Sequence, residues 1–279
     1  MTGSPIQTDP RSVALWYHTL DLPGGFTTPG WFDLRPVVER LPWPDVAGKR
    51  CLDVATYDGF LAFELERRGA REVVATDIAD HEDWDWPAAA RARGGIELAR
   101  LAGVKGHGFE AARAALGSKV QKRLINAYHL TPEEIGTFDV VVCGSLMLHL
   151  RDPVRALEAI RSVCSGWFMS IEEVSVKLSL MFRRRPLAEL RYSAQACQWS
   201  TPNMAGHRRM VEAAGFEVTR SVGPFAERFG PGHQARSLRQ RLRAKPLQPL
   251  IRRLTLGADG VPHAALLSRP CLEAPPIRL

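Results

Sequence analysis

The stretch CLDVATYDGF, residues 51–60, is typical of a buried strand that turns directly into a helix. In many nucleotide-binding folds this turn carries three glycines, and the middle one lets a pyrophosphate approach the backbone. Only Gly59 is kept here, while Ala55 and Tyr57 stand at the other two glycine positions. Tyr57 is bulky and Asp58 is anionic, and both oppose a pyrophosphate. The stretch therefore argues against a dinucleotide such as NAD.

Apolar segments typical of buried strands alternate with helical patterns around this turn. The five strand segments are RCLDVA (50–55), EVVATD (72–77), VQKRLINAY (120–128), FDVVVCGS (138–145) and GWFMSIEE (166–173). The helical segments are FLAFELERRG (60–69), GFEAARAALG (108–117) and DPVRALEAIRSV (152–163), the last with Pro153 just inside its start. This alternation predicts an α/β fold with a doubly wound, mostly parallel sheet and helices on both faces.

The pattern changes after Glu173. Residues 174–210 are rich in arginine and aromatic residues without strand spacing, which predicts an insertion after the fifth strand. MVEAAGFEVTRSV (210–222) restores helix and strand, and HAALLSRP (263–270) supplies a last strand. We therefore expect a seven-stranded sheet that ends in an antiparallel pair. The expected organisation is an N-terminal lid over 1–45 and a main domain over 46–279, with insertions at about 174–210 and 228–258.

Composition places the chain among soluble globular proteins. Its 279 residues can bury a full core, and 45% hydrophobic with 24% charged residues is ordinary for this class. No apolar run reaches the roughly 20 residues of a membrane span, and the N-terminus lacks the apolar core of a secretion signal. Five scattered cysteines without a CxxC pair, and eight histidines without ligand spacing, predict neither disulfides nor a metal site. We expect a cytoplasmic protein.

The net charge of +7 comes from one segment. Residues 228–258 hold eight Arg or Lys and no Asp or Glu, so the rest of the chain sums to −1. A solvated helical face is the favoured interpretation, and RNA, a phosphorylated substrate or a membrane surface are the alternatives. No aromatic residue lies between Gly230 and Ala258. The segment is therefore a poor base reader, because RNA bases are bound by stacking on aromatic rings.

Two carboxylates mark the ligand expected at the turn. Asp53 lies near the end of the first strand, and Asp77 ends the second strand 24 residues later, where an acidic residue can accept both ribose hydroxyls. With Asp58 beside the turn, the ligand should carry positive charge, one ribose and no phosphate. S-adenosylmethionine has a sulfonium, an amino group, a ribose and an adenine, and meets these conditions. The alternative is that Asp53 only caps the turn.

Four segments carry a family resemblance. They are WYHTLDLPGGFTTPGWFDLRP (16–36), LDVATYDGFLAFELERRGAREVVATD (52–77), FDVVVCGSLMLHLRDPVRALEAIRSV (138–163) and WSTPNMAGHRRMVEAAGF (199–216). The chain resembles class I S-adenosylmethionine-dependent methyltransferases with a Rossmann-like fold, and among them the group related to the tRNA wobble-uridine carboxymethyltransferases. The cofactor-binding residues this implies are Asp53, Ala55, Tyr57, Gly59, Asp77, Ile78, Ala127, Tyr128 and Gly144. Asp53 and Gly59 would line the methionine end, Asp77 the ribose, and Ile78, Ala127 and Tyr128 the adenine.

The chain departs from these relatives in two places. Many carry an acidic residue after the third strand for the adenine amino group, whereas NAYHL offers Asn126 or His129. The carboxymethylating relatives hold an extra carboxylate with a lysine before the first strand. WFDLR has no lysine, and Arg35 is the nearby cation. The second departure favours ordinary methyl transfer.

Four residues are candidates for the chemistry. His149 follows the fourth strand, Tyr17 and His18 belong to the expected lid, and Glu172 ends the fifth strand. Each has a structural alternative: His149 could anchor a turn, the lid residues could pack on the sheet edge, and Glu172 could face solvent. Methyl transfer depends largely on orientation, with a base needed only if the acceptor loses a proton. The substrate-binding candidates are Trp199, Asn203 and Arg35.

The sequence thus predicts a methyltransferase for the O, N or C atom of a small organic acceptor, with specialised metabolism as one setting. A tRNA-modifying methyl- or carboxymethyltransferase is the alternative enzyme. A non-catalytic sensor or scaffold that binds the cofactor is the alternative of another class. The acceptor and the oligomeric state are left open.

Overall fold

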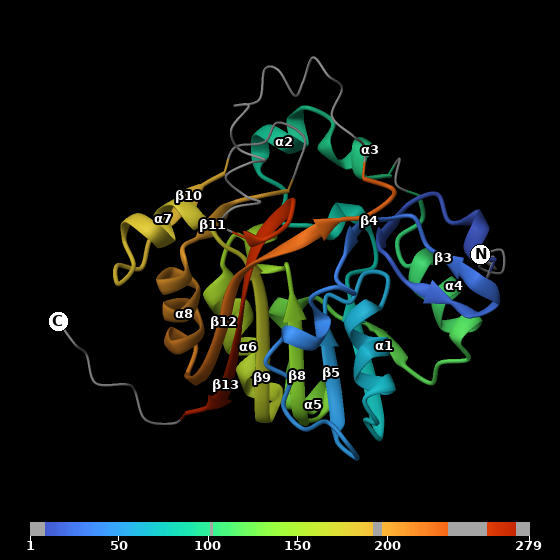
Figure 1. The fold of residues 1–279 in the computed structure, drawn as a ribbon, viewed down its shortest axis with the longest axis horizontal. Helices are drawn as coiled ribbons and strands as arrows, with labels where there is room; N and C mark the ends of the chain where they lie inside the picture. The colour runs from blue at the N-terminus through green and yellow to red at the C-terminus, as the bar shows by residue number, and fades with distance from the viewer. Residues whose placement is uncertain (1–8, 101–102, 192–196, 234–255, 272–279) are drawn as a thin grey trace.

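Nine strands form the central sheet of the computed structural model, which describes residues 9–100, 103–191, 197–233 and 256–271 (Figure 1). Their order is β1-β4-β12-β13-β9-β8-β5-β6-β7. The five expected parallel strands are β5 (Arg50–Val54), β6 (Glu72–Asp77), β7 (Gln121–Leu124), β8 (Phe138–Gly144) and β9 (Cys164–Glu173). The strand order reverses beside β5, with β6 on one side and β8 on the other, so ligands are expected over the carboxyl end of β5.

Two long strands complete the expected set. β12 (Phe216–Phe229) and β13 (Gly260–Pro270) pair antiparallel, and β13 continues antiparallel onto β9. The fold class is therefore confirmed. The sheet is wider than expected by two strands, because β4 (Gly30–Asp33) adds to β12 and β1 (Trp16–His18) adds to β4. A short hairpin, β2 (Asp21–Leu22) with β3 (Phe26–Thr27), lies between these two strands in the chain.

Helices cover both faces of the sheet. α1 (Phe60–Arg67) and α4 (His107–Leu116) share one buried apolar cluster with the N-terminal segment. α6 (Pro153–Val163) and α8 (Met204–Ala213) share the other, which also holds α5 (Pro132–Ile135). Pro153 is at the first turn of α6, where its missing N–H has no partner to lose. A third, smaller cluster holds α2 (Ala88–Ala92) and α3 (Gly95–Arg100).

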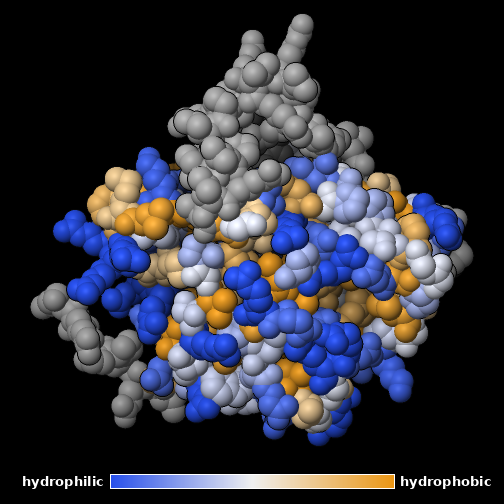
Figure 2. All heavy atoms as spheres, viewed as in Figure 1, coloured by the Kyte–Doolittle hydropathy of each residue, from blue (hydrophilic) through white to orange (hydrophobic). Residues whose placement is uncertain are grey.

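The insertion over 174–210 has more regular structure than its sequence suggests. It contains α7 (Val176–Met181), the paired strands β10 (Ala188–Leu190) and β11 (Ser200–Pro202), and the start of α8. Its two strands have three residues each, too few to show an alternating pattern. On the face shown in Figure 2, apolar side chains gather over α7 and β10. Most of the basic segment 228–258, residues 234–255, lies outside the described residues.

No helix of the described residues is long and apolar enough to cross a membrane. The same part of the chain has no cluster of three His, Cys, Asp or Glu residues arranged to hold a metal ion.

Candidate active site

The turn between β5 and α1 keeps a glycine-like backbone although two of the expected glycines are missing. Ala55 and Tyr57 have φ angles of 61° and 50°, and Gly59 has a φ of 92°. A left-handed conformation costs a residue with a side chain about 1–2 kcal/mol. A Cβ atom at Gly59 would lie 2.4 Å from the Phe63 ring, so this position also needs the absence of a side chain. Such strain is typical of ligand sites, where a particular backbone conformation is kept despite its free-energy cost.

Asp53 is a buried carboxylate without enough partners. It is 2% exposed, and its Oδ2 atom has no hydrogen-bond partner. Burial raises the pKa of Asp53 to about 7, and the nearby Asp77 adds to the rise. An unpaired acceptor at the switch point of the sheet is the group that a ligand ammonium would satisfy. Asp53 therefore fits the amino group of S-adenosylmethionine.

Asp77, at the end of β6, is paired with a lysine that sequence reasoning missed. Lys105 Nζ lies 2.8 Å from Asp77 Oδ2, and both side chains are nearly buried. The same Nζ lies 4.7 Å from the centre of the Tyr57 ring, so it is held from two sides. The other Asp77 oxygen accepts the Ile78 N–H at 2.8 Å. Asp77 could accept the hydroxyls of a ribose. These hydroxyls would have to share the Asp77 carboxylate with Lys105 or displace Lys105 from it.

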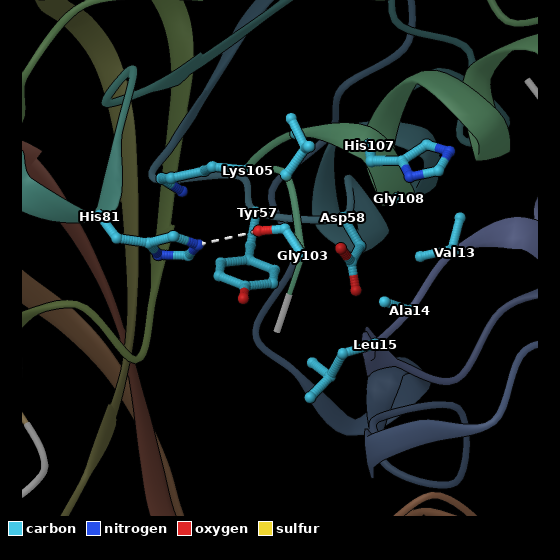
Figure 3. Close-up of a pocket in the computed structure, with 12 residues that line it drawn as sticks. Val13, Ala14, Leu15, Tyr57, Asp58, His81, Gly103, Lys105, His107 and Gly108 are labelled. Atoms are coloured by element: carbon cyan, nitrogen blue, oxygen red, sulfur yellow. Dashed lines mark hydrogen bonds between the residues drawn. The ribbon is translucent and has the colours of Figure 1, made fainter. Parts of the chain in front are cut away.

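The segment 103–108 and the N-terminal segment close over this turn (Figure 3). The hollow between them measures about 20 Å³, which is room for roughly one water molecule. Asp58, which the sequence led us to expect beside a positively charged ligand, is instead engaged by the N-terminal segment. Its Oδ2 accepts the backbone N–H groups of Tyr17 and His18 at 2.5 and 3.1 Å, and it thereby fixes β1 to the turn.

The expected adenine residues lie beyond β7. Ala127 is buried and Tyr128 is half-buried, and both belong to a short 3-10 helix capped by the Asn126 side chain. The capping bond engages the Asn126 oxygen. The Tyr128 hydroxyl donates to Asp85 at 2.6 Å. Asp85 is an acidic residue near this wall that sequence reasoning did not consider, because it comes from the loop after β6.

His149 and Trp199 lie together in a wall that follows β8. His149 Nδ1 donates to the Cys197 carbonyl, and burial lowers the pKa of this histidine. The Trp199 backbone N–H bonds the Leu148 carbonyl, and its indole N–H bonds the Asp85 carbonyl, at 2.8 and 2.7 Å. The structure thus brings His149 beside the expected substrate wall. At Gly144, the last residue of β8, an added Cβ atom would lie 3.0 Å from the Leu61 side chain, so any side chain there would displace Leu61.

Tyr17 and His18 reach the turn from the added strand β1. The Tyr17 ring lies 5.1 Å from the Tyr57 ring and 4.8 Å from the His18 ring, centre to centre. Burial lowers the pKa of His18 to about 3, so its ring is neutral, and its Nδ1 atom has no partner. Burial raises the pKa of Tyr17, and the nearby Glu227 adds to the effect.

Glu172 faces the protein interior rather than solvent. It is 1% exposed, and its two oxygens accept the backbone N–H groups of Leu146 and Met147 at 3.4 and 3.1 Å. Burial raises the pKa of Glu172 to about 8. Glu172 therefore anchors the segment that follows β8.

A polar cluster beside Glu172 was missed by sequence reasoning. His263 Nδ1 donates to the Val261 carbonyl at 3.1 Å, while its Nε2 lies 2.9 Å from Ser145 Oγ and 3.1 Å from Glu227 Oε2. Glu227 and His263 are buried, and burial raises the pKa of Glu227. Ser145 has a φ of 52°, the third strained non-glycine residue at this edge. These residues come from β12, β13 and the end of β8, too far apart in sequence to be linked by a pattern.

Two expected substrate residues are engaged in structural roles. Asn203 is fully buried, and its amide donates to the Phe182 and Arg185 carbonyls and accepts the Leu187 and Gly206 N–H groups. All four hydrogen-bond positions of this amide are used, which leaves none for a substrate. The Arg35 guanidinium is paired with Asp33 and Asp21 at 2.8 and 2.6 Å. Its charge is therefore balanced within the N-terminal segment.

Strand order, the switch point beside β5 and the two acidic strand ends define the class: the fold is that of S-adenosylmethionine-dependent methyltransferases. The model of the methyltransferase-domain family matches residues 33–221, and the chain belongs to this family. Two solved structures share the fold at 11–12% identity. One is a proposed methyltransferase in complex with the Trm112 activator of Haloferax volcanii, with a TM-score of 0.52, covering 86% of this chain and 88% of that one. The other is a proposed S-adenosylmethionine-dependent methyltransferase of Listeria monocytogenes, with a TM-score of 0.50 and coverage of 83% and 95%.

Curated relatives match over a shorter range. The ubiquinone biosynthesis O-methyltransferase of Bordetella bronchiseptica is 29% identical over 135 residues, 46% of each protein. That of Neisseria meningitidis serogroup A is 32% identical over 117 residues, 41% of this chain and 39% of the relative. The chain therefore matches less than half the length of these relatives.

Proposed function

We propose that the chain transfers a methyl group from S-adenosylmethionine to a nucleophilic O, N or C atom of a small organic acceptor. The observation that carries this proposal is Asp53, whose buried Oδ2 lacks a partner beside a turn with glycine-like backbone. A buried acceptor without a partner is costly, and a ligand cation would satisfy it. The family membership of residues 33–221 supports the same reaction.

The cofactor supplies, when bound, a methyl carbon attached to a sulfonium. Asp53 would hold its amino group, and the left-handed turn at Ala55, Tyr57 and Gly59 would admit its methionine end. Asp77 would accept the ribose hydroxyls, with Lys105 giving way or bonding a ribose oxygen. Ile78, Ala127 and Tyr128 would pack on the adenine, and Gly144 would allow close approach at the end of β8.

The acceptor would lie over the carboxyl ends of β8 and β9. Glu172 lies at the end of β9, and Tyr17, with His18 beside it, lies near Glu227. The Ser145–His263–Glu227 cluster is the buried polar group next to these strand ends. His263 Nδ1 donates to the Val261 carbonyl, while its Nε2 faces both Ser145 Oγ and the Glu227 carboxylate, so a proton would be shared among these groups. Ser145 is only half-buried and would connect His263 to the acceptor. The relatives are O-methyltransferases, which favours oxygen as the nucleophile.

The N-terminal segment 1–45 is proposed as a cover for this site. Its strand β1 is attached to the turn through Asp58, and residues 13–15 line the hollow beside Tyr57. Glycines Gly24 and Gly25 have φ angles of 78° and 75°, which permit bending there. We also propose a cytoplasmic location.

A tRNA-modifying enzyme of the wobble-uridine group is the second candidate. Its support would come from the basic segment 228–258, most of which lies outside the described residues. Arg35 is the cation in WFDLR, where the carboxymethylating relatives have a lysine nearby, and it is already paired with two carboxylates. This pairing favours ordinary methyl transfer.

Mass spectrometry of the small molecule released from freshly purified protein tests the proposal. S-adenosylmethionine or S-adenosylhomocysteine is expected, and methyl-labelled cofactor should then label an acceptor among phenols, enols and amines. His149→Ala and Asp53→Ala separate a catalyst from a sensor: a catalyst loses turnover in both variants, and a sensor loses only binding, in the Asp53 variant. Release of a carboxylated cofactor would instead favour the tRNA-modifying enzyme.

A further inference from the structure

An exposed apolar and cationic surface lies on the insertion after β9. Every residue from Leu180 to Ala188 is exposed, an arrangement unlike the rest of the described chain. The large apolar side chains are Leu180, Met181, Phe182, Leu187 and Leu190, with exposed fractions of 60, 62, 36, 36 and 90%. Figure 2 shows apolar side chains gathered here, beside hydrophilic ones. We call these five residues together with Arg183, Arg184 and Arg185 the α7–β10 surface.

The protein fixes this surface in place. The fully buried Asn203 makes four hydrogen bonds, three of them to the backbone of residues 182–187. The backbone of Leu187 is also bonded by the Asn203 N–H at 2.8 Å, and β10 pairs with β11. Apolar side chains held outward by a buried polar group expose area that water disfavours, and large exposed apolar patches mark interaction sites.

The charge of the surface indicates the partner. Residues 177–190 contain four basic residues and one acidic residue, Glu189, whose carboxylate accepts the Ser175 hydroxyl at 3.0 Å. Arg183 and Arg184 line an open hollow of about 400 Å³ together with Arg208 and Arg209 of α8. Among the described residues Glu212 is the acidic group in this hollow, and it bonds Arg208 at 2.7 Å. No ion pair within the described ranges engages Arg183, Arg184 or Arg209.

We propose that the α7–β10 surface docks this protein onto an anionic lipid bilayer. Leucine and methionine side chains would enter the boundary between headgroups and acyl chains, while the arginines bind headgroup phosphates. The aliphatic character separates this partner from RNA, which binds by stacking on aromatic rings, and four of the five apolar side chains here are aliphatic. The inference uses no feature of the active site and does not depend on the proposed reaction.

Vesicle co-sedimentation of the full chain tests this proposal. The probes are phosphatidylcholine vesicles with and without phosphatidylglycerol, at low and high ionic strength. The wild type should bind the mixed vesicles, and the binding should weaken with salt. Leu180→Ser with Leu190→Ser should lower the partition coefficient at least about 100-fold, because burying each leucine contributes roughly 1.5–3 kcal/mol. Arg183→Gln with Arg184→Gln should lower it about 25-fold, at about 1 kcal/mol per arginine.

The matched control is Leu124→Ser with Arg123→Gln. These residues are exposed on β7, an edge strand of the nine-stranded sheet, and the change should alter binding less than about twofold. The variants should keep the melting temperature and S-adenosylhomocysteine binding of the wild type. Absence of wild-type binding to mixed vesicles, or equal losses in the control, would overturn the proposal. It would also be overturned if Leu180→Ser with Leu190→Ser abolished a dimer in sedimentation velocity and left vesicle binding unchanged, since the occupant would then be a second copy.

Discussion

Replacing Asp53 by asparagine should make the protein more stable at alkaline pH and weaken its binding of the cofactor. Asp53 is 2% exposed with an unpaired Oδ2, and its pKa is raised from 3.8 to about 7. At about 1.36 kcal/mol per pH unit, this rise corresponds to about 4 kcal/mol of unfavourable free energy for the ionised carboxylate in the folded chain. Asparagine has the same shape and carries no charge.

The direction in which stability changes with pH follows from proton binding to Asp53. Between about pH 4 and pH 7 the folded chain keeps the Asp53 proton that the unfolded chain releases, so stability falls as pH rises. Above about pH 7 both states are ionised and the full loss persists. Asp53→Asn should therefore match the wild type near pH 4 and exceed its free energy of unfolding at pH 8 by up to about 4 kcal/mol.

Urea denaturation at a series of pH values measures this difference, with the exposed Asp45→Asn as the control. Calorimetry at pH 8 should show S-adenosylhomocysteine affinity about 10- to 100-fold weaker in Asp53→Asn, since a hydrogen bond to a charged group contributes about 1.5–3 kcal/mol. If wild type and Asp53→Asn had parallel pH profiles, the carboxylate would be compensated inside the protein, and the reasoning from its unpaired oxygen would be refuted.

Three further changes test neighbouring contacts. Lys105→Met leaves Asp77 unpaired, so the free protein should lose about 3–5 kcal/mol, and S-adenosylhomocysteine should raise its melting temperature more than that of the wild type; a smaller rise would show that Lys105 binds the ligand. Glu172→Leu leaves two backbone N–H groups without acceptors and should cost about 2–6 kcal/mol in urea denaturation, whereas Glu172→Gln should cost far less at pH 7; equal losses would contradict the pairing with Leu146 and Met147. Gly59→Ala should lower the free energy of unfolding by more than about 2 kcal/mol, because φ is 92° and Phe63 is too close, and an unchanged midpoint would contradict the described turn.

Most of the sheet could be predicted from the sequence because buried parallel strands are continuous apolar runs. β5, β6 and β8 are of this kind, and their helices have clear glycine or proline boundaries. β1, β4, β10 and β11 were missed. Strands of three or four residues carry too little periodicity, and their pairing depends on partners far away in the chain.

The candidate site was predictable only where it lies at strand ends. Asp53 and Asp77 could be predicted because they lie near the ends of β5 and β6, and the turn after β5 because it contains Gly59. Lys105, Ser145, Glu227 and His263 could not be found, because contacts such as that between Ser145 and His263 join residues 118 positions apart. The expectation that Asn203 binds substrate could not take account of the four backbone groups around its amide, because they come from positions that the sequence does not link to it.

Calorimetric titration of S-adenosylmethionine into the purified wild-type chain tests the central claim most directly. Saturable one-to-one binding is expected, with the affinity about 10- to 100-fold weaker in Asp53→Asn and unchanged in Asp45→Asn. Absence of binding to the wild type, or equal affinity in Asp53→Asn, would contradict the claim that the turn after β5 is a cofactor site.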